Sequence, residues 1–158
     1  MDRLNASIAD LRNYVLGLRP IRGSDRPLTK SLPTLAAQAR TNALIEVDVA
    51  VAPEAASALD GAGREAVFFI AADALGNIQR HARARHATVR LFLENSTVVL
   101  EVGDDGVGFD HELAVDGHGL RNMRERAFSA GGRLSLQTTP GRGSRVRFEM
   151  PVQEEAKV

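Results

Sequence analysis

The alternation of apolar and polar residues after Leu28 predicts a mixed series of helices and strands. Leu and Ala spacing indicates a helix at 28–40, and the period-two pattern "LIEVDVAV" at 44–51 indicates a half-buried strand. Further helices are expected at 60–84 and 119–130, and further strands at 87–94, 97–104, 133–139 and 144–150. Strand pairs separated by helices, without regular alternation, predict an α+β fold: a two-layer sandwich with helices on one face of a mixed, mostly antiparallel sheet.

A separate helix is predicted at the start of the chain. Leu4, Ile8, Leu11, Val15 and Leu18 recur at alternating four- and three-residue steps, the seam of a helix that packs on another helix. It stops at Pro20, and the Pro, Gly, Ser and Asp residues that follow mark a connector. We therefore expect a helical segment at 1–20, a linker at 21–27, the main domain at 28–152 and a tail at 153–158.

Composition narrows the class of protein. The 158 residues are 44% hydrophobic and 25% charged, as expected of one globular domain with an appendage. Twenty basic and twenty acidic residues cancel, which removes the overall field that non-specific nucleic-acid binders use. The chain has no cysteine, no apolar run long enough to span a bilayer and no signal-peptide pattern, so we expect it in the cytoplasm.

The predicted long helix carries two different faces. One is apolar and should pack on the sheet; it comprises Val67, Ala71, Ala74, Leu75, Ile78 and Ala82. Asp73, Asn77 and Arg80 line up on the opposite side, where Phe69 and Ile70 flank them. A carboxylate, a carboxamide and a guanidinium framed by apolar surface are typical of a pocket wall that faces a polar ligand and a hard cation. The alternative is an ordinary solvated helix face.

The stretch "LEVGDDGVGFD" at 100–110 leaves an apolar strand for two acids and three glycines. Asp104 falls where the strand ends, and Gly106 and Gly108 allow positive φ and the close approach of a ligand. An Asp-Gly pair is also a hairpin signal, but the residues that follow are polar and glycine-rich rather than a returning strand. Gly117 and Gly119 open the next helix, whose free N–H groups could cradle phosphate; the alternative is an ordinary glycine-rich loop.

Other chemistries fit the sequence less well. A P-loop is excluded, since the only lysines, Lys30 and Lys157, lie outside any GxxxxGK[ST] run. The pairs His81 with His86 and His111 with His118 lack the spacing of common metal motifs. The run "RHARARH" at 80–86 could contact phosphates of a nucleic acid, but aromatic residues are only 4% of the chain, so no direct nucleic-acid partner is expected.

Four ordered boxes, "DALGNIQRHARA", "DDGVGFD", "GHGL" and "PGRGSRVRFEMP", resemble the ATP-binding catalytic domain of bacterial sensor histidine kinases. The resemblance is closest to the NarX/DesK-like subgroup, within the GHKL superfamily that also contains gyrase and mismatch-repair ATPases. It implies a Bergerat-type ATP-binding fold, with residues 1–20 as the C-terminal part of a dimerisation and phosphoacceptor helix hairpin. It also implies ATP and Mg²⁺ as cofactors, a response regulator as partner, and a homodimer for the parent protein.

The resemblance also implies roles for particular residues. Asn77 would coordinate Mg²⁺ and act in catalysis with Asp73, which could reach the metal through water, and Asp104 would accept a hydrogen bond from the adenine amino group. Gly106 and Gly108 would shape the base pocket, and Gly117 and Gly119 would belong to a lid over the phosphates. The full set of implied ATP-binding residues is Asn77, Arg80, His81, Asp104, Gly106, Gly108, Gly117, His118, Gly119, Leu120 and Ser144.

The chain departs from the kinase pattern in two places. Asp73 stands where the family usually has Glu, one methylene longer. The family phosphorylates a histidine on its first dimerisation helix, yet the first histidine here is His81. We therefore predict the catalytic domain of a protein-histidine kinase that binds Mg-ATP and donates phosphoryl to a histidine outside this chain. The alternative is a nucleotide-binding interaction module, such as an anti-sigma-like domain, that regulates a partner protein.

Overall fold

A computed structural model describes residues 27–108 and 118–152 of the chain. The predicted helix at 1–20, the predicted tail at 153–158 and all but the last residue of the predicted linker lie outside the described residues. The elements are α2 (Leu28–Ala43), β1 (Glu46–Val51), α3 (Pro53–Ala58), α4 (Gly61–Asn77), the π-helix η1 (Ile78–Ala82), β2 (His86–Glu94), β3 (Thr97–Asp104), α6 (His118–Ser129), β4 (Arg133–Thr138) and β5 (Ser144–Pro151). Among the helices of this described part, none is long and apolar enough to cross a membrane.

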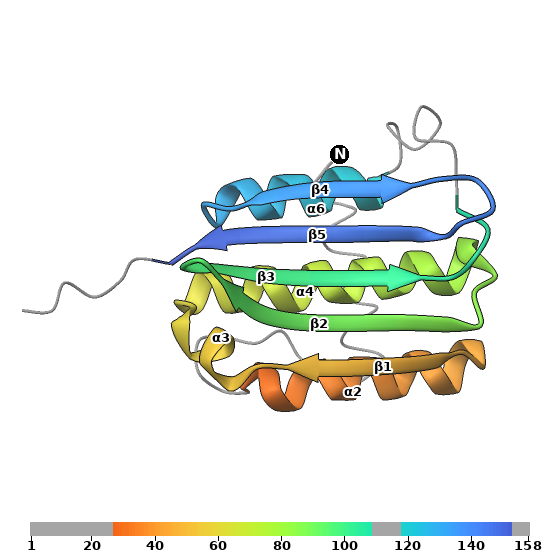
Figure 1. Cartoon of the computed structure of the whole chain (residues 1–158), viewed down its shortest axis with the longest axis horizontal. Helices are drawn as coiled ribbons and strands as arrows, with labels where there is room; N and C mark the ends of the chain where they lie inside the picture. Colours follow the sequence, from red (N-terminus) through yellow and green to blue (C-terminus); the bar gives the residue numbers. More distant parts are fainter. Residues whose placement is uncertain (1–26, 109–117, 153–158) are drawn as a thin grey trace, which may run out of the picture.

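The five strands form one sheet in the order β1-β2-β3-β5-β4, with helices α2, α4 and α6 against one face (Figure 1). Only the β1–β2 pair is parallel; the other three neighbouring pairs are antiparallel. The predicted α+β sandwich with a mixed, mostly antiparallel sheet is therefore confirmed. The register places Glu46 beside His86 and Asp104 beside Ser144, so residues far apart in sequence meet at one end of the sheet.

The sheet has one apolar face and one charged face because successive side chains along each strand point to opposite faces. In β3, Val98, Leu100 and Val102 are buried in the core, where Phe148 of β5 joins them. On the helix-free face, the guanidinium of Arg147 binds three carboxylates, those of Glu94, Glu101 and Glu149, at 2.7, 2.5 and 3.1 Å. This network satisfies the charges across three strands and leaves the core to apolar side chains.

The long helix α4 begins at an N-cap, where Asp60 Oδ1 accepts a hydrogen bond from the Gly63 backbone N–H at 2.7 Å. All six residues of its predicted apolar face are buried. The prediction of a regular helix as far as residue 84 is wrong from Ile78 onward. There the chain widens into the π-helical turn η1, which ends at Arg83 with φ 49°. Such turns occur often at functional sites.

Two further features differ from the sequence prediction. Helix α3 was not predicted; it is a single short element that begins at Pro53, a residue suited to the first helical turn. Leu44, predicted in a strand, instead caps the C-terminus of α2 with φ 56° and is 91% exposed. The helix predicted at 119–130 ends at a glycine pair: Gly131 has φ 89°, and Gly132 N–H donates to the Ala127 carbonyl at 2.9 Å.

Candidate functional site

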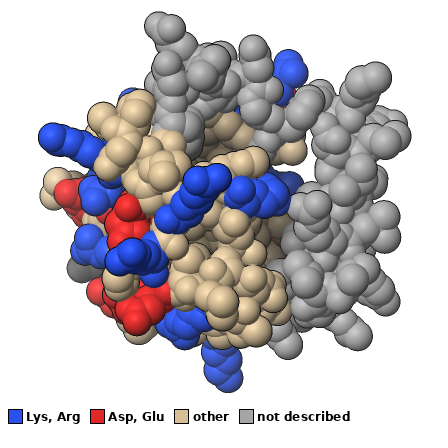
Figure 2. Space-filling view, turned by 90° about the vertical axis from the view of Figure 1, so that its right-hand side faces the viewer, with Lys and Arg blue, Asp and Glu red and all other residues tan. Residues whose placement is uncertain are grey.

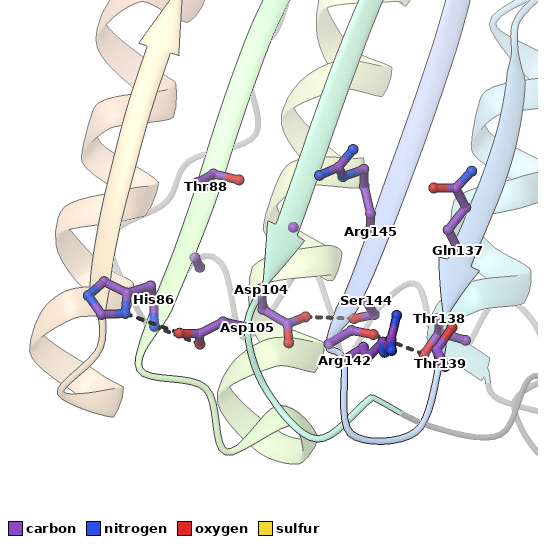
Figure 3. Close-up of a pocket in the computed structure, with 13 residues that line it drawn as sticks. His86, Thr88, Asp104, Asp105, Gln137, Thr138, Thr139, Arg142, Ser144 and Arg145 are labelled. Carbon is purple, nitrogen blue, oxygen red and sulfur yellow. Dashed lines mark hydrogen bonds and ion pairs between the residues drawn. The ribbon is translucent and has the colours of Figure 1, made fainter.

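Asp104 lies at the C-terminal end of β3 (Figure 3), and two neighbouring groups hold its carboxylate. The Ser144 hydroxyl on the neighbouring strand β5 donates to Asp104 Oδ2 at 2.6 Å, and the Gly106 backbone N–H donates to Oδ1 at 2.8 Å. The two bonds fix the direction of a half-buried carboxylate that can accept further hydrogen bonds, because two oxygens offer about four lone pairs. Asp104 and Ser144, both predicted site residues, are thus brought into contact.

The glycine positions of the loop after Asp104 are set by contacts with protein backbone. A Cβ atom at Gly106 would lie 2.1 Å from the Ala82 carbonyl oxygen, which also accepts a hydrogen bond from Val107 N–H at 2.8 Å. Gly108 has φ 64°, and a Cβ there would lie 2.1 Å from the Thr139 carbonyl oxygen. We expected these glycines to admit a ligand; the close neighbours observed are the end of η1 and the β4–β5 turn.

The β4–β5 turn closes on the same loop. Gly143 has φ 78°, and a Cβ there would lie 2.1 Å from the Asp104 carbonyl oxygen, while Gly141 N–H donates to the Val107 carbonyl at 2.5 Å. The alternative interpretation of the Asp-Gly pair as a hairpin turn is excluded, because both edges of β3 already pair with other strands, β2 and β5. Residues 104–108 are therefore clamped between η1 on one side and residues 139–143 on the other.

The predicted polar stripe lies at the junction of α4 and η1. Asp73 and Asn77 are half-buried, and Arg80 is exposed; the Asn77 Oδ1 accepts a hydrogen bond from Arg80 Nη2 at 2.9 Å. Phe69 and Ile70, which were expected to frame the stripe, are 5% and 0% exposed. Asn77 thus lies one helical turn after Asp73, at the C-terminal end of α4. The π-helical turn η1 that follows it contacts the loop after Asp104.

The second glycine segment is described only in part. Gly117 lies outside the described residues, and α6 begins at His118. Leu120 is 7% exposed and belongs to the core. His81 is exposed on η1. In residues 27–108 and 118–152, no group of three or more His, Cys, Asp or Glu side chains is placed to hold a metal ion by itself.

A groove of about 450 Å³ opens at this end of the sheet (Figure 3). Its lining includes the expected Asp104 and Ser144 and side chains that the sequence did not single out for a site: Thr88, Asp105, Gln137, Arg142 and Arg145. Asp105, Arg142 and Arg145 could have been found, since they stand inside the boxes "DDGVGFD" and "PGRGSRVRFEMP". Viewed end-on, basic and acidic side chains lie close together on this end of the molecule (Figure 2).

His86 also lines the groove and connects two carboxylates. Its Nε2 lies 3.0 Å from Glu46 Oε2, and its Nδ1 lies 3.1 Å from Asp105 Oδ2. The hydrogen bond with Asp105, followed by the charge of Glu46, raises the pKa of His86 above its ordinary value of 6.5. The backbone hydrogen bond from His86, together with its side chain, lowers the pKa of Asp105 below 3.8. When it is protonated, His86 is an ion-pair partner of both carboxylates.

The sheet, the helix layer and the glycine loop that follows Asp104 define an ATPase domain of the histidine kinase type. The chain matches the family described as histidine kinase-, DNA gyrase B-, and HSP90-like ATPase over residues 63–154, a stretch that contains most of α4 and both Asn77 and Asp104. Because this match covers more than half of the chain, the protein belongs to that family.

Individual relatives agree with this assignment. The sensor histidine kinase LiaS of Bacillus subtilis (strain 168) is 30% identical over 149 residues, which are 94% of this chain and 41% of LiaS. Among solved structures, histidine kinase AdeS of Acinetobacter baumannii superposes with a TM-score of 0.68 at 12% identity, covering 97% of this chain and 80% of that one. The blue-light activated histidine kinase of Erythrobacter litoralis EL346 gives 0.64 at 20% identity, covering 84% and 44%. The chain thus spans less than half the length of LiaS, and the two structures show the shared fold.

Proposed function

We propose that this chain binds Mg-ATP and donates the γ-phosphoryl group to a histidine, as the catalytic domain of a two-component sensor kinase. The observation that carries the proposal is the carboxylate of Asp104, held by Ser144 and by the Gly106 N–H at the end of β3. An ionised carboxylate only accepts hydrogen bonds, and the amino group of adenine donates them. The base would therefore bind beside the clamped loop 104–108.

The phosphates and Mg²⁺ would lie along the polar stripe of α4. Mg²⁺ in nucleotide sites is usually held by one or two protein oxygens together with phosphate oxygens and water, so a cage of three acids is not required. Asn77 Oδ1 suits this role, with Asp73 one turn earlier acting through a water molecule. Since Arg80 donates to that oxygen at 2.9 Å, metal binding would break this bond and release the guanidinium to pair with a phosphate.

The transfer step follows from this placement. A ring nitrogen of the acceptor histidine attacks the γ-phosphorus, a P–N bond forms, and the bond from the γ-phosphorus to the β,γ-bridging oxygen breaks. ADP leaves with that electron pair, and the ring proton of the acceptor is released. The domain contributes by positioning and by charge neutralisation, with little covalent chemistry of its own. The acceptor is a histidine of a dimerisation domain outside these 158 residues, with a response regulator downstream in the cytoplasm.

A phosphotransfer assay tests the proposal. The chain is mixed with γ-labelled ATP, Mg²⁺ and the separately produced dimerisation domain of LiaS, with the LiaS catalytic domain as positive control. We expect an acid-labile label on the acceptor histidine that disappears with Asp104→Asn and when the acceptor histidine is replaced by glutamine. If the LiaS control labels the acceptor and this chain binds ATP without labelling it, a nucleotide-binding interaction module becomes the better assignment.

A further inference from the structure

His86 stands between carboxylates that belong to two different neighbouring strands. On one side is Glu46, its register partner on β1, with the Nε2–Oε2 distance at 3.0 Å. On the other side is Asp105, directly after β3, with the Nδ1–Oδ2 distance at 3.1 Å (Figure 3). Because β1 and β2 are parallel and in fixed register, the backbone itself places Glu46 and His86 side by side.

Asp105 is tied to the start of β2 by both its side chain and its backbone. Its Oδ1 accepts hydrogen bonds from the backbone N–H groups of Arg85 and His86, both at 2.9 Å, and its own N–H donates to the His86 carbonyl at 3.1 Å. The imidazole adds a bond to the second carboxylate oxygen. Asp105 lies between Asp104 and Gly106 in the chain, so its tie to β2 holds the backbone on both sides of it, including the Gly106 N–H that donates to Asp104 Oδ1.

Protonation decides whether His86 can serve both carboxylates. The imidazolium has two N–H donors, one for Glu46 and one for Asp105, whereas a neutral ring has one donor and turns a lone pair toward the other carboxylate. Asp48, the next acid along β1, lies opposite Thr88, and Arg85 precedes the histidine in the chain. The two contacting groups are both acidic, and they raise the pKa of His86.

We propose that His86 is a positioning residue of the nucleotide site, which holds Asp105, and through it Asp104, in the arrangement that receives adenine. The inference rests on the proposed adenine site at Asp104. Its consequence is a pH dependence: the charged ring is fully present below pH 6.5 and is lost as the pH rises through the raised folded-state pKa, so nucleotide affinity falls there. The His86 side chain is 56% exposed, so solvent limits the effect to about twofold to fivefold in affinity.

The test measures ATP affinity at pH 6.0 and pH 8.5 for the wild type and three substitutions of His86. The amide nitrogen of His86→Asn falls close to the position of Nδ1 and can donate to Asp105 without charge. The amide of His86→Gln falls close to Nε2, on the Glu46 side, and His86→Ala removes both donors. Glu46→Gln is a matched control that keeps the Asp105 bond. Because ATP itself titrates in this window, the readout is the ratio of variant to wild-type affinity at each pH.

At pH 6.0 we expect His86→Ala and His86→Gln to bind ATP about twofold to fivefold more weakly than the wild type, and His86→Asn, which like a neutral ring has one uncharged donor for Asp105, to fall between these variants and the wild type. As the pH rises to 8.5 and the ring loses its charge, the Asn variant should approach the wild type, and the differences of the Ala and Gln variants from the wild type should become smaller. Equal affinity of His86→Ala and wild type at both pH values would overturn the positioning role, as would an Asn variant as weak as Ala at pH 6.0. A wild type that binds no adenine nucleotide at either pH overturns instead the adenine site itself, and urea unfolding of each variant separates these results from loss of the fold.

Discussion

Gly106→Ala tests whether the close contact between the Asp104 loop and the end of η1 shapes the site. A Cβ at position 106 would lie 2.1 Å from the Ala82 carbonyl oxygen and 2.8 Å from the carbonyl carbon. Real Cβ atoms essentially never approach closer than 3.0 Å, so one of the two backbones must move by about 0.9 Å, the difference between these distances. Because both partners are backbone, no side-chain rotation relieves the overlap.

The expected cost has two parts. Overpacking of this kind costs about 1–3 kcal/mol, and loss of the Val107 N–H to Ala82 hydrogen bond costs about 1 kcal/mol more. We therefore expect Gly106→Ala to lower the free energy of unfolding by about 2–4 kcal/mol in urea denaturation followed by circular dichroism. ATP affinity should fall about tenfold, because a displaced Gly106 N–H no longer orients Asp104 Oδ1.

Gly61→Ala is the matched control. Gly61 is the first residue of α4, and a Cβ there meets nothing within 4 Å, so the same substitution should leave ATP affinity unchanged. Its free energy of unfolding should stay within about 0.5 kcal/mol of the wild type or rise slightly, since alanine is the better helix former. If Gly106→Ala behaves like Gly61→Ala in both measurements, the contact between Gly106 and the Ala82 carbonyl does not shape the site.

Three further predictions concern stability. Asp60→Ala should lower the free energy of unfolding by about 1 kcal/mol through loss of the 2.7 Å cap to Gly63 N–H, and an unchanged urea midpoint would argue against the cap. Phe148→Ala, at a fully buried position, should cost about 3–5 kcal/mol in the same assay, whereas a cost below about 1 kcal/mol would contradict its place in the core. Asp105→Asn should lower the free energy of unfolding at neutral pH. The pKa of Asp105 is lowered in the folded protein, so its carboxylate contributes stability above pH 3.8, and this contribution is lost as the pH falls through the folded-state pKa. Unfolding curves from pH 7 to pH 3 should therefore converge for variant and wild type, and a constant difference would disprove this linkage.

The sequence was sufficient to predict those parts of the fold that local residue patterns determine. The apolar face of α4 was predicted because six residues at helical spacing can point to only one layer. The strands predicted at 87–94 and 97–104 leave two residues between them, Asn95 and Ser96, and these adopt φ 50° and 58°, the left-handed pair that a tight hairpin turn needs. The π-helical turn at Ile78–Ala82 was missed because it changes the backbone hydrogen bonding while the apolar spacing remains that of an α-helix.

The site was predicted less completely than the fold. Gly106 was expected to allow the close approach of a ligand, whereas the group observed where its Cβ would lie is the Ala82 carbonyl, and the sequence alone does not distinguish the two requirements. Glu46 and His86 are forty residues apart and meet because β1 and β2 pair in parallel. Strand order and register depend on packing of the whole sheet, so contacts of this kind cannot be derived from local spacing. The roles of Asp73 and Asn77 remain predictions.

Calorimetric titration of ATP, with and without Mg²⁺, measures directly whether the Asp104 site binds the nucleotide. The wild type should bind ATP, and Asp104→Asn, which removes the charge and half of the acceptor oxygens, should abolish binding. Asn77→Ala should keep binding to free ATP but lose the enhancement by Mg²⁺. A wild type that binds no adenine nucleotide, or an Asp104→Asn variant that binds as tightly as the wild type, would rule out Asp104 as the adenine site.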